Sequence, residues 1–221
     1  MSEEASGIPN QDKLYETALK LEARAEVENL MGRYAFMLTA GMYDEICGLF
    51  TQNQPDVRAE MNWGVYEGYS GILRCYANYH KNEICGPGVM AVHALTTPVI
   101  EVAGDHKTAK AVWVSPGNIT GGMFSHDKVL RAYWAWMRYG CDFIYEDVWK
   151  IWHLHVYGLF MSQFDKSWTE QGDAHEMPDF PPEYAPDRPP TYSWAYSANG
   201  CTENVPAPPK PYMTFDRNDE Y

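Results

Sequence analysis

The stretch RYAFMLTAGMYDEICGLF, residues 33–50, carries the strongest fold signal in the chain, since it joins two helical patterns through a glycine. Upstream of it, apolar residues recur at spacings near three and four from Asp12 to Ala40, which predicts an amphipathic helix over that range. Gly41 is a natural helix stop. The pattern then predicts a short second helix from Tyr43 to Phe50, which Pro55 closes off.

Alternating apolar and polar residues follow the two helices and predict strands. Residues 57–67 indicate a hairpin that turns at Gly64, and Ser70 caps a third predicted helix from Gly71 to His80. The glycine-rich segment 117–123 is predicted as a mobile connection between strands, because it lacks the lysine and the strand-loop-helix setting of a phosphate cradle. Four further strands are predicted at Met90–Val102, Thr108–Ser115, Leu130–Tyr145 and Val148–Phe160.

The composition is that of an ordinary globular protein with an acidic surface. The 221 residues are 45% hydrophobic, and 17 Lys and Arg against 30 Asp and Glu give a formal net charge of −13. This charge repels phosphate backbones and anionic lipids, so we expect neither nucleic acid nor a membrane as a partner. The sequence has neither a signal-peptide pattern nor an apolar run long enough for a membrane span, so a cytoplasmic location is expected.

The five cysteines are scattered along the chain without CxxC spacing, which predicts free thiols rather than a disulfide framework or a zinc knuckle. They are Cys47, Cys75, Cys85, Cys141 and Cys201.

The C-terminal region is dense in proline, which disfavours regular helix and sheet. It could be a flexible tail, but disordered tails are usually poor in aromatic residues, and this one is rich in them. We therefore favour an extended arm that wraps over the domain or over a neighbouring subunit. The predicted organisation is a flexible N-terminus at 1–11, one domain at 12–168 and the arm at 169–221.

The order of these elements resembles the NTF2-like superfamily and, within it, the SnoaL-like domain family. Residues 33–50 resemble the family's first-helix pattern, Gly68-Tyr-Ser-Gly-Ile72 resembles a helix start, and WKIWHLHVY at 149–157 looks like its closing strand. The resemblance implies an α+β cone, with three N-terminal helices packed on a strongly curved mixed sheet around a deep pocket. Similar proteins include ketosteroid isomerase, scytalone dehydratase and bile acid 7α-dehydratase, whose reactions are mostly cofactor-free proton transfers and eliminations.

The resemblance implies two first candidates for catalysis. Tyr34 falls where ketosteroid isomerase and bile acid dehydratase place a pocket tyrosine, which suggests a phenol that stabilises an oxyanion, although a core tyrosine remains the alternative. The isomerase carries its catalytic carboxylate on the first strand, where this chain has Glu60, with Arg58 and Asn62 on the same face. A shift of one residue would place Met61 there, and those three residues would then form a solvated outer face.

The chain departs from bile acid dehydratase at two functional positions. Thr39 stands where that family member has an aspartate, and Thr96 matches its catalytic histidine. His93 lies three residues earlier, which in a regular strand places it on the opposite face from Thr96. His93 therefore remains a candidate for proton transfer, with a hydrogen-bonded structural histidine as the alternative.

His153 and His155 share one face of the last predicted strand. Two imidazoles lack the third protein ligand that a catalytic zinc normally needs, so no metal site is expected. A general acid or base within the pair, or histidines that serve packing or an interface, remain the two interpretations. Aromatic surface that could hold a ring system, or serve a core or an interface, is supplied by Trp63, Trp113, Trp134 and Trp136.

Taken together, the sequence predicts a cofactor-independent lyase or isomerase that acts on an aromatic or polycyclic apolar small molecule. Tyr34 would stabilise negative charge, and Glu60, His93 or His153 would move the proton. A homodimer or higher homo-oligomer is expected. The alternatives are a non-catalytic small-molecule binding protein of the same fold and a metal-dependent enzyme using His153 and His155. Substrate binding is assigned to Arg58, Asn62, Trp63, Trp113, Trp134, Trp136 and His155.

Overall fold

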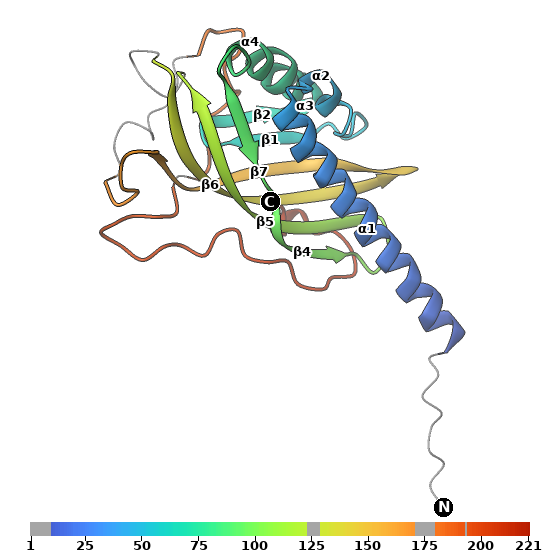
Figure 1. Cartoon of the computed structure of the whole chain (residues 1–221). Coiled ribbons are helices and arrows are strands. Elements are labelled where there is room, and N and C mark those ends of the chain that lie inside the picture. The colour runs from blue at the N-terminus through green and yellow to red at the C-terminus, as the bar shows by residue number, and fades with distance from the viewer. Residues whose placement is uncertain (1–9, 123–128, 171–179, 193) are drawn as a thin grey trace, which may run out of the picture.

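The computed structural model describes residues 10–122, 129–170, 180–192 and 194–221, and it has an α+β architecture. Helices cover one face of a curved mixed sheet (Figure 1), which confirms the predicted fold class. The helices are α1 (Gln11–Ala40), α2 (Tyr43–Cys47), α3 (Gly68–Leu73), the π-helix η1 (Arg74–His80), α4 (Lys81–Glu83) and the 3-10 helix η3 (Arg217–Asp219).

The sheet has the strand order β2-β1-β7-β6-β5-β3, and β4 pairs with β5 beside β3. Strand β1 runs parallel to β7, and the other pairs are antiparallel. The strands are β1 (Arg58–Met61), β2 (Gly64–Glu67), β3 (Met90–His93), β4 (Thr96–Val102), β5 (Thr108–Gly121), β6 (Arg131–Glu146) and β7 (Val148–Gln163).

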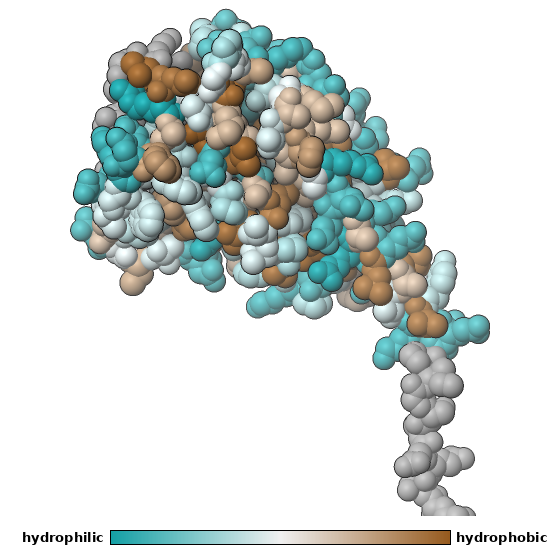
Figure 2. All heavy atoms as spheres, viewed as in Figure 1, coloured by the Kyte–Doolittle hydropathy of each residue, from teal (hydrophilic) through white to brown (hydrophobic). Residues whose placement is uncertain are grey.

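Helix α1 begins and ends at residues suited to those positions. The Asn10 side chain accepts a hydrogen bond from the Asp12 backbone N–H, and Gly41 closes the helix in the left-handed conformation with φ 70°. The N-terminal part of α1 extends beyond the sheet (Figure 1), and Leu14 and Leu21 are exposed. Figure 2 shows hydrophobic and hydrophilic residues side by side on the surface of this end of the molecule. No helix in the described ranges combines the length and the apolarity that crossing a membrane requires.

The structure corrects two of the predicted strand boundaries. The single strand expected over Met90–Val102 is broken into β3 and β4, with Thr97 in the left-handed region at φ 48° just beyond the break. Residues 117–121, expected to be a mobile connection, instead continue β5 and pair with β6. Glycine fits at position 117 because the His93 ring and the Ala135 carbonyl occupy the space that a Cβ would need. Met123 lies outside the described residues.

The third predicted helix changes its winding along its length. Helix α3 gives way at Arg74 to the seven-residue π-helix η1, which continues to His80. Such wide turns are rare and recur at functional sites. The buried side chains of η1 are Cys75, Tyr76, Tyr79 and His80. The amphipathic period predicted this helix and its buried residues, but not the change to π winding.

Side-chain alternation along β6 and β7 divides the sheet into two faces. Tyr139 lies on the face that packs against α1, since its ring meets that of Tyr34 at 6.1 Å between centroids. We call this the helix face. Gly140 and Asp142 point the other way, together with their β7 partners His155 and His153. We call this second side the tail face, because C-terminal residues contact it.

C-terminal residues contact the tail face and the margins of the sheet. The Tyr221 N–H donates to Asp142 Oδ2 at 2.9 Å, and the Gly104 N–H donates to the Tyr212 carbonyl at the same distance. The Ala195 N–H donates to the Gly158 carbonyl at 2.9 Å, where β7 extends past β1. The orange-to-red coil in Figure 1 accordingly winds around the sheet away from α1.

The close approach of Tyr221 to Gly140 gives a test of this contact. A Cβ at Gly140 would lie 2.7 Å from the Tyr221 ring and 3.1 Å from the Tyr157 ring. We expect Gly140→Ala to lower the unfolding free energy by about 1–3 kcal/mol in urea titrations, because one of the rings must move. Gly200→Ala is the control, since no described atom lies within 4 Å of its Cβ position. Equal stability of the two variants would contradict the contact.

Candidate functional site

Three buried tyrosines form a hydrogen-bonded group between α1, η1 and the helix face. The hydroxyls of Tyr34 and Tyr76 lie 2.9 Å apart, and the Tyr34 hydroxyl also bonds that of Tyr139. Burial raises the pKa of all three phenols, so they stay neutral across the physiological range. Three hydroxyls carry three protons, and two internal bonds use two of them. One proton therefore remains to donate to a further acceptor.

His80 lies beside this group at the end of η1. Its ring stacks on Tyr76 at 5.0 Å, and its Nδ1 lies 2.6 Å from the Cys75 carbonyl oxygen. Burial lowers the pKa of His80 from 6.5 to about 4, against the opposing effect of the Cys75 bond. At neutral pH the imidazole is consequently uncharged. With Nδ1–H donating to that carbonyl, Nε2 is the basic nitrogen.

His93 enters the same region from β3. It pairs with Gly117, whose partner Ala135 lies on the helix face, whereas Thr96 pairs with Val114 on the other side of β5. Burial, followed by the nearby His80, lowers the pKa of His93 to about 4. Its Nδ1 is buried and has no hydrogen-bond partner among the described residues.

Ser115 supplies a second polar atom of this kind. It pairs with Met137 on the helix face, two residues along β5 from the partner of His93. Its hydroxyl is fully buried and also lacks a hydrogen-bond partner within the described ranges. Buried polar atoms without partners are rare in proteins, since each costs about 1–3 kcal/mol. Two of them on one face indicate a place where a ligand or water supplies the missing hydrogen bonds.

Other residues assigned from the sequence also lie on the helix face. Trp113 pairs with Tyr139 in the sheet and is buried in the core. The Trp63 ring lies 5.8 Å from that of His80, and Asn62 contacts Met137 Sδ at 3.3 Å. The structure thus brings Tyr34, His93, Trp63, Trp113 and Asn62 to one side of the sheet.

The remaining catalytic candidates lie on the tail face. Glu60 Oε1 lies 3.1 Å from His155 Nε2 and accepts two hydrogen bonds of 2.6 Å from Thr191. Burial alone would raise the pKa of Glu60, but the bonds from His155 and Thr191 outweigh it and lower the pKa to about 2. Glu60 is therefore ionised at neutral pH and held by C-terminal residues. Arg58, next to it on this face, forms an ion pair with Glu220.

His153 belongs to a separate buried group on the tail face. Its Nδ1 lies 2.8 Å from Asp142 Oδ2, and Lys110 lies 3.2 Å from the other oxygen of that carboxylate. Asp142 and His153 are completely buried. The predicted catalytic set, Tyr34, Glu60, His93 and His153, is therefore divided between two faces of the sheet.

Trp134 and Trp136 also point away from Tyr34. Trp134 stacks on Phe164 at 5.6 Å and Trp136 stacks on Phe160 at 6.0 Å, on the tail-face side of β6 and β7. These rings stack along the outer side of the strands and do not line the tyrosine group. Across the described ranges, no three His, Cys, Asp or Glu side chains come together in a group that could hold a metal ion.

The sequence did not single out four residues of the helix-face site for chemistry. They are Tyr76, His80, Ser115 and Tyr139. Tyr76 was assigned to the apolar stripe of a helix, and His80 was only the last residue of that helix. The sequence did offer a signal for Ser115. It lies two residues after Trp113 in the same strand, so both side chains point to the same face of the sheet.

This fold and site define a protein of the NTF2-like class, in which helices cover a curved sheet and polar side chains meet beneath them. The sequence model of the SnoaL-like domain family matches residues 19–155, and the chain belongs to that family. This confirms the resemblance inferred from the sequence. Among curated proteins, none matches the chain significantly.

Solved structures show the same fold at low sequence identity. A candidate scytalone dehydratase from Novosphingobium aromaticivorans is 13% identical with a TM-score of 0.54, covering 68% of this chain and 93% of its own. Hexachlorocyclohexane dehydrochlorinase LinA type 3 from Novosphingobium barchaimii is 14% identical with a TM-score of 0.51, at 66% and 93% coverage. A candidate dehydratase of the NTF2-like family from Streptomyces avermitilis is 19% identical with a TM-score of 0.50, at 61% and 95%.

The low pKa of His80 predicts a pH dependence of stability. Between pH 6.5 and about 4 the unfolded state binds a proton that the folded state does not, so the unfolding free energy falls as the pH falls. We expect the loss between pH 7 and pH 4.5 to be smaller by about 2 kcal/mol in His80→Gln than in the wild type. Urea titrations of the wild type and the variant at pH 7 and pH 4.5 measure this difference in stability.

His106→Gln is the matched control for this experiment, because His106 is partly exposed and pairs with Glu16, whereas His80 is buried. It should retain the wild-type loss of stability on acidification. An identical pH dependence in His80→Gln and the wild type would show that His80 is not buried in its neutral form.

Proposed function

We propose that this protein is a cofactor-independent lyase or isomerase that moves a proton on an aromatic or polycyclic apolar small molecule. The reaction takes place on the helix face, between the tyrosine group and His93. The observation that carries the proposal is the half-buried, uncharged His93 imidazole with its buried, unpartnered Nδ1, on the same face as a phenol group with one proton left to donate.

The imidazole of His93 can accept a proton from carbon without first losing one. It is neutral above about pH 4, so no proton has to leave the ring before the reaction begins. The Nδ1 atom is already removed from water, so it loses little solvation when substrate arrives. His80 adds a second neutral ring nearby, and its charge would oppose that of His93 if both were protonated.

The tyrosine group is suited to stabilise the negative charge that develops on the substrate. When a base removes the proton next to a carbonyl, the electron pair moves towards the carbonyl oxygen. A phenol held in place by Tyr76 and Tyr139 can donate to that oxygen without reorganising. Departure of a group from the neighbouring carbon completes an elimination, whereas return of the proton to another carbon completes an isomerisation.

The walls of the site favour an apolar ring system as substrate. Trp63, Trp113 and Tyr139 supply aromatic surface around a few polar atoms, which is the usual composition of a small-molecule site. The Ser115 hydroxyl would bind a polar substituent of the substrate. SnoaL-like family membership supports this proposal, as does likeness in fold to a dehydrochlorinase and to candidate dehydratases.

The proposal is tested by incubating the protein with hydroxylated steroids, bile acids, polyketide-like phenols and diaryl dimers, with product analysis by mass spectrometry for loss of mass and by NMR for isomers. Loss of water or a shift in double-bond position supports the proposed reaction class. Tight binding of a compound without any product would instead indicate a non-catalytic binding protein.

For a compound that turns over, we expect Tyr34→Phe to lower kcat by about 10²–10³, because an oxyanion donor is lost. His93→Gln should lower kcat by about 10²–10⁴ through loss of the base. Tyr145→Phe and His106→Gln are matched controls, since Tyr145 is exposed and His106 is paired at the surface. Wild-type rates in both site variants would sink the assignment of these residues.

The pH profile gives an independent prediction. Because His93 has a pKa of about 4 and the phenol pKa values are raised, kcat/KM should stay level from about pH 5 to pH 9. The acid limb should fall near pH 4 instead of near the ordinary histidine value of 6.5. An acid limb at pH 6–7 would mean that the base is a solvated group and not His93.

A further inference from the structure

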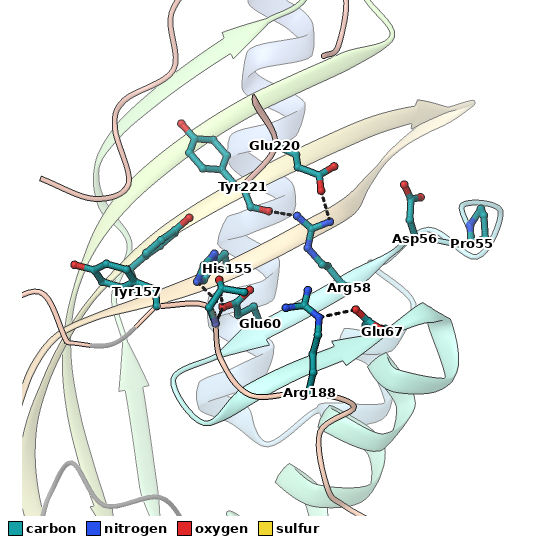
Figure 3. Close-up of a pocket in the computed structure, with 12 residues that line it drawn as sticks. Pro55, Asp56, Arg58, Glu60, Glu67, His155, Tyr157, Arg188, Glu220 and Tyr221 are labelled. Carbon is teal, nitrogen blue, oxygen red and sulfur yellow. Dashed lines mark hydrogen bonds and ion pairs between the residues drawn. The ribbon is translucent and has the colours of Figure 1, made fainter. Parts of the chain in front are cut away.

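A second cavity lies on the tail face, across the sheet from Tyr34. It has a volume of about 640 Å³ and lies between β1, β7 and C-terminal residues. Figure 3 shows Arg58 from β1 and Arg188 from the C-terminal segment directed towards the same space. Glu60 and His155 line it and are more than nine-tenths buried. A cavity of this volume is within the usual range for small-molecule sites.

Most charges in the wall of this cavity are paired with an opposite charge. Glu67 pairs with Arg188 at 2.7 Å and Glu220 with Arg58 at 3.2 Å. Asp56, which also lines the cavity, is paired with Arg217 from outside the lining. The fourth lining carboxylate, Glu60, is held by His155 and Thr191. The wall therefore offers neither an unpaired cation for an anionic ligand nor an array of free carboxylates for a cationic one.

The paired groups still have hydrogen-bonding capacity to spare. Arg188 uses Nε for Glu67, which leaves its two terminal amino groups without a hydrogen-bond partner among the described residues. Glu60 uses Oε1 for its contacts with His155 and Thr191, so Oε2 keeps its acceptor capacity. Donors and acceptors thus face one cavity. A hydroxyl group matches such a wall, since it both donates and accepts.

Aromatic rings form the rest of the wall. Tyr157 stacks on His155 at 3.7 Å between centroids, and Tyr192 lies 5.4 Å from Tyr157. The faces of such rings contact the apolar C–H face of a saturated ring. The lining as a whole combines flat apolar surfaces with hydrogen-bonding groups whose charges are mostly paired.

We propose that the tail-face cavity is a binding site for a neutral, polyhydroxylated small molecule of the size of a disaccharide or glycoside. Its hydroxyls bond Arg188 and Glu60, and a ring face packs on Tyr157 or Tyr192. The site lies on the opposite face of the sheet from Tyr34 and does not depend on the proposed reaction. Binding here can therefore fail or succeed without deciding whether the helix face is catalytic.

The test measures binding of maltose, cellobiose, lactose, sucrose and xylobiose by saturation-transfer NMR and calorimetry. Charged comparators are 4-hydroxybenzoate and choline. The proteins are the wild type, Arg188→Gln and Tyr192→Ala, with Arg24→Gln as matched control because Arg24 is exposed on α1. Tyr34→Phe tests whether sugar binding depends on the helix face. Thermal unfolding of each variant establishes that it is folded.

We expect at least one disaccharide to bind saturably and to lose about tenfold in affinity in Arg188→Gln and in Tyr192→Ala. Arg24→Gln and Tyr34→Phe should bind it as the wild type does. The proposal is overturned if no disaccharide binds at millimolar concentrations, or if only a charged comparator binds. It is also overturned if Arg188→Gln and Tyr192→Ala both bind the sugar as tightly as the wild type.

Discussion

The antiparallel ladder between β6 and β7 is the constraint on which the rest of the structure depends. The ladder runs along nearly the whole of both strands. Strand β5 pairs with the other edge of β6, and β1 pairs with the other edge of β7. Side chains alternate along the ladder, so a slip of one residue would carry Asp142 into the apolar interior and turn Tyr139 outward. An unpaired carboxylate in that interior costs several kcal/mol, and the register is fixed accordingly.

The two faces separated by this ladder hold polar groups in opposite states. On the helix face, burial without a charged partner keeps the phenol of Tyr34 and the imidazoles of His80 and His93 neutral. On the tail face, Glu60 stays ionised because His155 and Thr191 compensate its burial. Neutral donors and bases suit proton transfer within an apolar site, whereas fixed ionic pairs suit recognition by hydrogen bonds.

Hydrophobic periodicity and the family resemblance together were sufficient to predict the fold, and they named some of the residues of the candidate site. Periodicity located α1 and the long strands, and the family resemblance located Tyr34. The sequence pattern could not show which face of β1 points into the core. C-terminal residues such as Thr191 cover the polar face of β1, so Glu60 is buried there as well. His80 continues the helical spacing of the buried residues, but its contact with Tyr76 could not be predicted from that spacing. The position of His93 depends on a strand that ends before Thr96, and the sequence pattern does not show this break.

Burial of Asp142 shows how the tail face and the C-terminal residues depend on each other. Its carboxylate is removed from water by Tyr221, and part of the compensation comes from the same residue through its backbone N–H. His153 and Lys110 supply the rest from the sheet. Desolvation of such a group offsets much of what its contacts contribute. The group therefore adds little net stability, and its effect is to fix where the last residues of the chain lie.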